Sequence, residues 1–301
     1  MPKLSVLMSV LNGEAFLRPA IDSILGQTFR DFEFIIVDNA SRDSTPTILD
    51  SYRDDRIVRL RNDAVVSLTE SLNRGLQVAR GSYIARMDAD DIAAPARLAR
   101  QTEFLDVHPN VALVASHVRL IDRNGAAFAY ISRPTDPREL YDALAYCNPF
   151  AHSATMFRRA PVVALGGYPS NYQFAQDLAL WLKLAQPGRL GMIDDALVDM
   201  REHRGQTTFS PDLALLRHRE SIAIFEAAQR LPELSDKARR LGRMNLAKIH
   251  CFLAGALLTS GKTVQALVEL TRGIRLAPMF CVRRAMAGRW RTALPGMQLP
   301  D

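Results

Sequence analysis

The sequence is poor in features that would assign it to several other protein classes. It has only three cysteines, Cys147, Cys251 and Cys281, which are widely spaced and include no CxxC pair. This pattern supports no disulfide framework and fits reduced thiols in a cytoplasmic protein. The most apolar later stretch, residues 249–258, is far shorter than the roughly 18 to 20 residues that cross a bilayer, and residues 1–10 lack a signal-peptide cleavage site. We therefore expect no membrane-spanning segment.

Two phosphate-binding loops of related α/β enzymes are also missing. A dinucleotide-dependent oxidoreductase needs a GxGxxG turn after its first strand, and residues 11–16 do not contain one. A sugar-nucleotide pyrophosphorylase would open with a glycine- and arginine-rich triphosphate loop, which this sequence lacks. Both enzyme classes are therefore disfavoured.

The composition indicates a folded protein with an anionic partner. Of its 301 residues, 48% are hydrophobic and 23% are charged, which is ordinary for a globular chain. The length suits one large domain with a smaller appendage. The formal net charge of +6 favours an anionic ligand, but nucleic acid, phospholipid and nucleotide-sugar all meet that condition. Charge alone leaves the partner open.

The first part of the sequence alternates apolar strands with amphipathic helices. Apolar runs predict strands at residues 4–10, 32–37, 57–60 and 83–87. Helical spacing and turn residues predict helices between them, at residues 15–25, 46–52 and 68–79. The alternation is typical of an α/β fold with a parallel sheet covered by helices on both faces.

The later sequence is less regular and then becomes helical. A helix at 95–107, a strand at 111–116 and a helix at 177–184 are predicted, whereas residues 132–156 follow no clear pattern. From Pro211 onward the sequence is helical in character, which predicts a boundary near Thr208, with one domain over 1–208 and a helical region over 209–301. Residues 246–260 and 264–276 read as one tetratricopeptide-like hairpin, which we expect to pack on the first domain or on a partner.

Acidic and amide side chains follow three of the predicted strands. They lie in the segments 12–14, 38–44 and 88–91. Ligands of such sheets bind beyond the carboxyl ends of the strands, so we expect these segments to meet at one rim.

The third segment, Asp88-Ala89-Asp90-Asp91, is the strongest candidate for a metal site. Carboxylates held together at a strand end repel one another unless a cation is present. Mg²⁺ and Mn²⁺ take oxygen ligands and share substrate phosphates, so one or two protein carboxylates suffice. The alternative is an acidic loop in which Asp91 caps the following helix.

Other candidate residues keep two or, for His203, three interpretations. Asp38 either accepts hydrogen bonds from a ribose or base, or forms a turn with Ser41. Asp177 either acts as a general base or interacts with the dipole of the helix that it begins. His152 is either a core histidine or part of an acceptor pocket. His203 is a metal ligand, a phosphate contact or a surface histidine, and Arg80 either meets a diphosphate or is solvated.

Three groups of motifs resemble family 2 glycosyltransferases of the GT-A fold, over residues 4–208. Residues 5–14 (SVLMSVLNGE), 21–28 (IDSILGQT) and 35–41 (IIVDNAS) resemble the opening signature of that family. Residues 73–91, from Asn-Arg-Gly to the acidic segment, resemble its NxG helix and metal motif. Gly166-Gly167-Tyr168 with Asp177 and Leu180-Trp181 resembles its acceptor-side motif.

The resemblance implies an inverting transferase with a nucleotide-diphosphate-sugar donor, UDP-sugar favoured, and Mn²⁺ or Mg²⁺ as cofactor. It further implies a glycan or lipid-linked acceptor in surface polysaccharide synthesis and no nucleic acid partner. Asp38 would contact the base, Asp88 the ribose and Asp90 the metal, while Asp177 would be the catalytic base. The implied donor-binding set is Ser9, Leu11, Asn12, Glu14, Asp38, Asn39, Asn73, Arg80, Asp88 and Ala89. The implied metal ligands are Asp90 and His203, and the implied sugar and acceptor pocket is His152, Gly167, Tyr168, Gln176 and Trp181.

The sequence departs from the family pattern at three positions. Leu11 replaces an aromatic residue near the base, which makes the donor less certain. Gln176 replaces a glutamate and removes one charge beside Asp177, and Asn39 replaces the second carboxylate of a VDD pattern. None of these removes the metal site or the base.

Two further expectations concern the C-terminal part. From Arg272 onward the chain is rich in arginine and partly apolar, which predicts peripheral contact with an anionic membrane surface, on the inner face of the membrane, or else a solvated end. The alternative to an enzyme is a catalytically inactive GT-A-like scaffold that binds a partner through its C-terminal helices.

Overall fold

The computed structural model describes residues 1–203, 206 and 213–281. The chain divides into two compact units, one of residues 1–140 and 150–202 and the other of residues 141–149 and 203–301. The division thus falls after Glu202, whereas Thr208, near which the sequence predicted a boundary, lies outside the described residues. The inclusion of residues 141–149 in the second unit has no counterpart in the sequence pattern.

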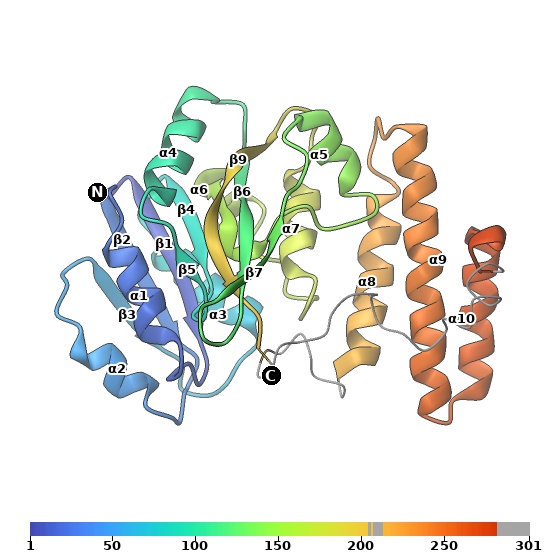
Figure 1. Cartoon of the computed structure of the whole chain (residues 1–301), viewed down its shortest axis with the longest axis horizontal. Helices are drawn as coiled ribbons and strands as arrows, with labels where there is room; N and C mark the ends of the chain where they lie inside the picture. Colours follow the sequence, from blue (N-terminus) through green and yellow to red (C-terminus); the bar gives the residue numbers. More distant parts are fainter. Residues whose placement is uncertain (204–205, 207–212, 282–301) are drawn as a thin grey trace. The chain divides into compact units, whose positions relative to one another are not determined.

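The first unit is built on one nine-stranded sheet (Figure 1), whose order is β3-β2-β1-β4-β8-β6-β9-β5, with β7 paired to β6. Its strands are β1 (Leu4–Val10), β2 (Phe32–Asp38), β3 (Ile57–Arg61), β4 (Tyr83–Met87), β5 (Ile92–Ala93), β6 (Leu113–Ile121), β7 (Ala127–Ile131), β8 (Thr155–Arg158) and β9 (Leu190–Arg201). Its helices are α1 (Leu17–Leu25), α2 (Thr45–Ser51), α3 (Leu68–Val78), α4 (Arg97–Val107), α6 (Arg159–Ala164) and α7 (Gln176–Leu184), and α5 (Pro137–Ala143) crosses into the second unit.

The first four strands form the parallel part of the sheet. β1 pairs with β2 and β4, and β2 pairs with β3, all in parallel. Every residue of β1 and β2 is buried, because helices cover both faces of this part. These strands and α1 to α3 lie within two residues of their predicted bounds, which confirms the alternation seen in the sequence.

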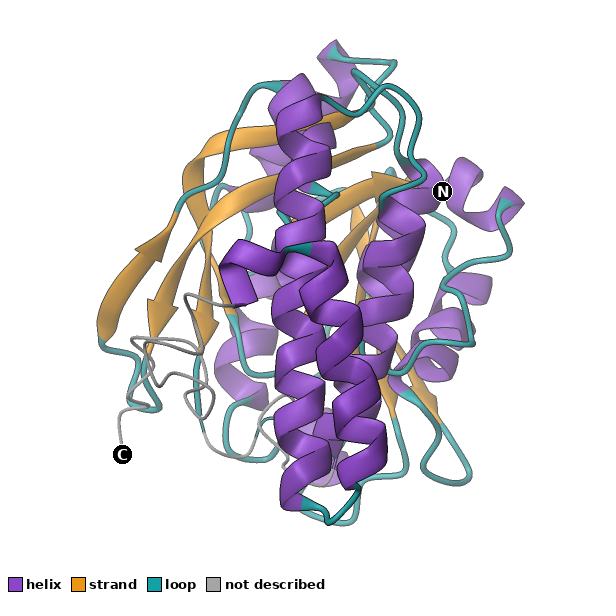
Figure 2. Ribbon diagram, turned by 90° about the vertical axis from the view of Figure 1, so that its right-hand side faces the viewer, coloured by secondary structure: helices purple, strands orange, loops and turns teal. Residues whose placement is uncertain are grey.

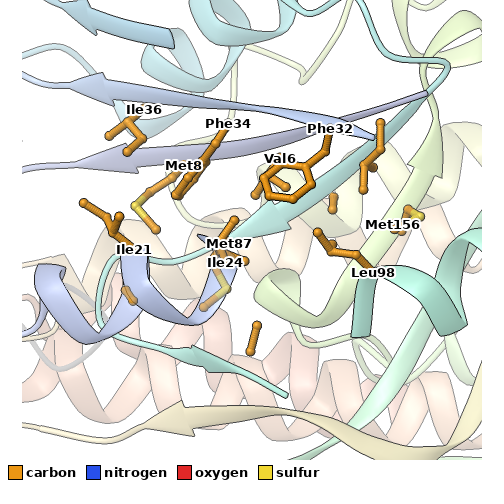
Figure 3. Packing of buried hydrophobic residues seen from close by; sticks show 14 of the residues in the cluster. Val6, Met8, Ile21, Ile24, Phe32, Phe34, Ile36, Met87, Leu98 and Met156 are labelled. Carbon is orange, nitrogen blue, oxygen red and sulfur yellow. The ribbon is translucent and has the colours of Figure 1, made fainter. Parts of the chain in front are cut away.

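Helices α1 and α3 cover opposite faces of these strands. Val6, Met8 and Phe34 pack with Ile21 and Ile24 of α1 in one core cluster (Figure 3). On the other face, a Cβ on Gly75 of α3 would lie 2.3 Å from Leu7 Cδ1 and 3.1 Å from Val37 Cγ2. Neighbouring residues of a strand point to opposite faces, which explains this division, and only glycine allows α3 to approach so closely.

The rest of the sheet is mixed, which corrects the expectation of a mostly parallel sheet for this half. β8 is antiparallel to both β4 and β6, and β7 to β6, whereas β9 is parallel to β6. Neither β8 nor β9 was predicted from the sequence. β8 has only four residues, and the apolar pattern of β9 is interrupted by the exposed residues Asp194 and Asp195. An α/β fold with helices on the sheet is nevertheless the architecture that the sequence predicted.

The described part of the second unit is helical. It contains α8 (Ala214–Ala228), α9 (Asp236–Thr259) and α10 (Thr263–Leu276). Helices α9 and α10 pack side by side as a hairpin (Figure 2), closed by Gly261 with a φ of +73°. Among the residues that the structure describes, every helix is too short or too polar to cross a bilayer.

Candidate active site

The loops that follow β1 and β2 are joined by a ladder of hydrogen bonds. Asn12 has a φ of 52°, and its backbone N–H donates to Ser41 Oγ at 2.9 Å, while Arg42 N donates to Asn12 Oδ1 at 2.9 Å. Gly13 N donates to Thr45 Oγ1 at 2.8 Å, and Ser44 N donates to Glu14 Oε2 at 2.9 Å. The two strand exits therefore form one rigid rim, and the amide and carboxylate of the first loop hold the second.

Asp38 and Asn39 at the end of β2 are buried within this rim. Asp38 is 2% exposed, and its carboxylate accepts from Ser41 N at 2.9 Å and from Arg61 Nη1 at 2.8 Å. Asp38 therefore forms the turn with Ser41 that was one of its two interpretations. Asn39 donates to Val66 O at 2.8 Å and accepts from Val66 N at 3.0 Å, which fixes the loop after β3.

The remaining residues of the implied donor set in this region differ in exposure. Ser9 is 9% exposed and donates to Ser71 Oγ of α3 at 2.7 Å. Leu11 is 45% exposed and lies beside the ladder. A Cβ on Gly13 would lie 3.9 Å from Ala89 Cβ, so the loop after β1 adjoins the acidic loop after β4.

Each carboxylate of the acidic loop has a different environment. Asp88 accepts from Arg86 Nη2 at 2.5 Å and keeps 37% side-chain exposure. Asp91 is 2% exposed and accepts from Ser153 Oγ and, at 2.8 Å, from Arg201 N. Burial, followed by the charges of Asp90 and Asp88, raises the pKa of Asp91 well above its ordinary value. Asp91 therefore holds the loop in place while Asp88 and Asp90 remain partly accessible.

The suggested capping role of Asp91 is not what the structure shows. Helix α4 begins at Arg97, its N-cap is Ala96, and no side chain caps it. The carboxylate of Asp91 instead bonds to residues that precede β8 and end β9.

Three buried arginines support the acidic loop. None of them was predicted from the sequence as a site residue. Arg86 and Arg97 are both fully buried, and Arg97 Nη2 donates to Arg86 O at 2.6 Å. Arg201 donates to the backbone carbonyls of Asp90, Asp122 and Arg123, each at 2.9 Å. The available signal was a charged residue inside an apolar strand, Arg86 in Tyr83–Met87.

The chemistry of the acidic loop fits a divalent cation. Among the described residues, no group of three His, Cys, Asp or Glu side chains is arranged to hold a metal ion. Mg²⁺ and Mn²⁺ need only one or two protein carboxylates when substrate phosphates complete the shell. Burial is the largest cause of the raised pKa of Asp91, and the charges of Asp90 and Asp88 come next; a cation would offset these charges.

The implied acceptor pocket is assembled from α3, the turn before α7 and the 3₁₀ helix His152–Ala154. Asn73 Nδ2 donates to Tyr168 O at 2.8 Å, and Tyr168 N donates to Asn73 Oδ1 at 2.8 Å. Gly167 has a φ of +82°, and a Cβ there would lie 2.5 Å from Asn73 Oδ1. Both ends of the Asn73 amide therefore position the Gly167-Tyr168 turn.

His152 connects this turn to the acidic loop. His152 Nε2 and the Tyr168 hydroxyl are 2.9 Å apart, and the rings of His152 and Trp181 are 6.0 Å apart. Burial, and then the Arg86 charge, hold the pKa of His152 well below its ordinary value, so the imidazole is neutral. The next residue, Ser153, is the one that donates to Asp91.

Helix α7 brings Asp177 to the same cluster. Asp177 lies in the first turn of α7 and is partly buried. Burial raises the pKa of Tyr168, and the charges of Asp177 and Asp88 raise it further against the opposing charge of Arg86. The 3₁₀ helix that carries His152 contacts both the acidic loop, through Ser153, and α7, through Trp181.

Two polar atoms of α7 are buried without a hydrogen-bond partner in the described part of the chain. They are Gln176 Oε1 and Trp181 Nε1, on residues that are 5% and 0% exposed. Buried polar atoms are usually paired, so these two atoms are exceptions to that rule.

One residue of the implied set, Arg80, lies apart from this cluster. Arg80 Nε donates to Glu33 Oε2 at 2.8 Å near the amino ends of β1 and β2, where Ser5 pairs with Glu33. The expected contact of Arg80 with a diphosphate is therefore corrected, because this edge is opposite the rim of Asp38 and Asp88. His203 belongs to the second unit, and its role as a metal ligand stays a prediction.

Solved glycosyltransferases share the fold of this chain. Staphylococcus aureus TarS superposes with a TM-score of 0.65 at 14% identity, over 99% of this chain and 97% of the TarS chain. A mannosyltransferase from Pyrobaculum calidifontis, solved with GDP-Man and Mn²⁺, superposes with a TM-score of 0.58 at 20% identity, over 96% and 88%. These likenesses confirm the GT-A architecture.

Sequence comparisons identify the family. The model of glycosyl transferase family 2 matches residues 5–164. The putative glycosyltransferase EpsE of Bacillus subtilis is 34% identical over 241 residues, 76% of this chain and 83% of its own length. The O-antigen biosynthesis glycosyltransferase WbnJ of Escherichia coli is 30% identical over 209 residues, 68% of this chain and 81% of its own. Together with the rim and the acidic loop, these matches show that the chain belongs to glycosyltransferase family 2.

Proposed function

We propose that this chain is an inverting, metal-dependent glycosyltransferase that moves a sugar from a nucleotide diphosphate to an acceptor hydroxyl. The observation that carries the proposal is the pair of contacts made by the 3₁₀ helix His152–Ala154. Ser153 donates to Asp91 of the acidic loop, and the ring centroids of His152 and of Trp181 in α7 are 6.0 Å apart. One short segment thereby holds both the acidic loop suited to a cation and the helix that carries the proposed proton acceptor, as a single displacement needs.

The donor in this proposal is a nucleotide-sugar, with a UDP-sugar favoured. Asp38 and Asp88 would contact its base and ribose, and Leu11 and Asn12 would line the same site at the exposed edge of the rim. TarS has been solved with UDP-GlcNAc, and a relative from Escherichia coli is named as a UDP-Glc-dependent glucosyltransferase. The Pyrobaculum neighbour was solved with GDP-Man, so the choice of base is an outcome of the test below.

The proposed metal ligand is Asp90, with His203 as a second candidate. When bound there, Mn²⁺ or Mg²⁺ would stabilise the charge that develops on the leaving diphosphate. Arg201 holds the backbone of Asp90, and Asp91 anchors the loop through Ser153, so that the chain positions the carboxylate in advance.

Asp177 is the proposed general base. Its carboxylate would take the proton from the acceptor hydroxyl, whose oxygen attacks the anomeric carbon on the side opposite the nucleoside diphosphate. The bond to the diphosphate breaks in the same step, so the configuration of the anomeric carbon inverts. Gln176 Oε1 and Trp181 Nε1 offer an acceptor and a donor for sugar hydroxyls.

The proposed acceptor is a glycan or lipid-linked sugar in polysaccharide synthesis at the inner face of a membrane. Relatives named for O-antigen and amylovoran biosynthesis, and one named for an undecaprenol diphosphate acceptor, support this choice.

Thermal denaturation with a panel of nucleotide-sugars tests the donor and the metal together. A ligand that binds only the folded state raises the melting temperature. We expect UDP-sugars to stabilise the protein in the presence of Mn²⁺ or Mg²⁺ and to lose most of this effect in EDTA or in Asp90→Asn. Equal stabilisation with and without metal would contradict metal dependence, and no stabilisation by any nucleotide-sugar would contradict the enzyme itself.

A further inference from the structure

Helix α10 is apolar on two adjoining sides. Ala266, Leu270 and Gly273 form its inner side and pack against α9. At about 100° per residue, positions 264, 267, 268 and 274 fall beside this inner side, within an arc of about 120°. The remaining arc carries the polar residues Gln265, Glu269 and Arg272, so the contact with α9 covers only part of the apolar surface of the helix.

The outer side is nevertheless exposed in the structure. Val264 is 76% exposed, Leu267 58%, Val268 46% and Ile274 42%. We call these four residues the outer stripe of α10. Met279, just beyond the end of α10, is 67% exposed as well. A contiguous apolar surface of this kind usually marks an interaction site, whereas scattered apolar residues need no explanation.

The hairpin that carries the outer stripe is strongly basic. Between Asp236 and Cys281 the sequence has eight lysines and arginines but only two carboxylates, Asp236 and Glu269. Glu269 is occupied, because it pairs with both His250 and Arg272. The hairpin therefore carries a net charge of +6, as large as that of the whole chain.

Several of these cations are free to meet an anionic surface. Lys237, Arg240 and Arg243 are exposed and make no ion pair with any residue that the structure describes. With Asp236 and Arg239 they line a hollow of about 420 Å³ at the start of α9. Lys262 precedes the outer stripe and Arg275 lies within it, and both are exposed.

From this arrangement we propose that the outer stripe of α10 docks on an anionic lipid surface, with the cations of the hairpin facing the lipid phosphates. Apolar residues on one side of a helix enter the boundary between headgroups and acyl chains, and nearby lysines and arginines add electrostatic attraction. Each cation near such a surface strengthens binding roughly fivefold. The proposal assigns the membrane contact to described residues of the hairpin and does not depend on the donor or the metal.

The net positive charge of the hairpin disfavours a second copy of the chain as the partner of the outer stripe. Two hairpins that met along their outer stripes would each bring a net charge of +6 with no complementary acidic surface on the hairpin. Like charges across an interface oppose association. A lipid surface supplies negative charge and hydrocarbon at once.

Co-sedimentation of the full chain with vesicles tests the proposal. We expect the protein to sediment with vesicles of phosphatidylcholine mixed with phosphatidylglycerol, weakly with phosphatidylcholine alone, and less at high salt. The double variant Leu267→Ser with Val268→Ser should bind the anionic vesicles about tenfold less, because it removes apolar surface. A matched control, Val107→Ser with Phe128→Ser, changes residues of similar exposure in the first unit and should bind within about twofold of the wild type.

Circular dichroism melting checks that both double variants are folded, and the single variant Val264→Ser, at the most exposed position, should show a smaller loss of binding in the same direction. The proposal is overturned if the wild type does not sediment with anionic vesicles, or if the two double variants sediment equally. It is also overturned if sedimentation velocity shows a wild-type dimer that Leu267→Ser with Val268→Ser dissociates, since the occupant would then be a second copy.

Discussion

Positive charge is placed inside the first unit and on the surface of the second. Arg86 and Arg97 are fully buried, and Arg201 is 4% exposed, and all three donate to backbone carbonyls or carboxylates around the acidic loop. In the hairpin of the second unit, Lys237 and Arg240 are exposed and unpaired within the described residues. The first arrangement positions a site for a small ligand, whereas the second generates a field for a large anionic surface.

Apolar side chains differ in the same way. In the first unit, the residues of β1 and β2 and the core side of α1 are buried. In the second unit, α10 buries one side and exposes the outer stripe. The comparison predicts that substitutions at the candidate site or at buried positions of the first unit affect transfer or stability, and that substitutions on the exterior of the hairpin affect neither.

The largest effect is expected at Asp177. Replacing it with Asn keeps the size of the side chain but removes the proton acceptor, so transfer should fall by about 10² to 10⁴-fold. Donor binding, measured by thermal stabilisation, should persist. The exposed Asp55→Asn is the matched control and should transfer normally. Full activity of Asp177→Asn would remove this residue from the role of base.

The next effect is expected at Arg97. Arg97→Met keeps a long side chain but leaves the carbonyls of Arg86 and Thr155 without their buried donor. Removing one partner of a buried charged network lowers the free energy of unfolding by about 3 kcal/mol. Urea denaturation measures this loss, with the exposed Arg100→Met as the control on the same helix. A loss no larger than that of the control would show that Arg97 does not support the acidic loop.

A smaller, pH-dependent effect is expected at Glu33. Burial alone would raise the pKa of Glu33, but hydrogen bonds from Arg80 and Ser5 outweigh burial and hold it below its ordinary value of 4.5. Because the folded-state pKa is the lower one, this contribution is fully present above pH 4.5 and is lost as the pH falls below it. Glu33→Gln should therefore be less stable than the wild type by about 1 to 2 kcal/mol at pH 7.

Urea denaturation at pH 7 and at pH 3 measures the difference in free energy of unfolding between Glu33→Gln and the wild type. This difference should be smaller at pH 3 than at pH 7. A difference that stays constant across this range would mean that the charge of Glu33 is not the stabilising feature.

The smallest effect is expected on the hairpin exterior. The triple variant Lys237→Gln, Arg240→Gln and Arg243→Gln should change the free energy of unfolding by at most about 0.5 kcal/mol per residue, because the three side chains are exposed and unpaired. Transfer to a water-soluble acceptor should be unchanged. A large loss of stability would show that these cations hold the fold, as the buried arginines of the first unit do.

Much of the parallel half of the sheet could be predicted from the sequence. Strands buried on both faces read as continuous apolar runs, and Leu4–Val10 and Tyr83–Met87 have the bounds that their patterns predicted. The mixed half could not be predicted in this way. β8 is too short for a pattern, and β9 changes register against β6 between Ser116 and Val118, so its alternation is interrupted.

The candidate site residues also fall into two groups, those with a local sequence signal and those that only the fold brings together. Asp38, Asp88, Asp90 and Asp177 could be proposed from the sequence because acidic residues at strand and helix ends stand out in an apolar context. The supporting partners were not, since Arg61, Ser153 and Arg201 come from segments that only the fold brings to the rim. The same lack of long-range information placed Arg80 with the donor-binding residues, although it lies beside Glu33.

By itself the sequence determined the family, the alternation of the first four strands and the positions of the carboxylates, because these depend on local patterns and short motifs. Only the tertiary structure decided which segments contact the acidic loop, which arginines support that loop and which side of α10 is exposed. Each of these depends on contacts between residues far apart in the chain, whose distances are set by packing and not by sequence separation.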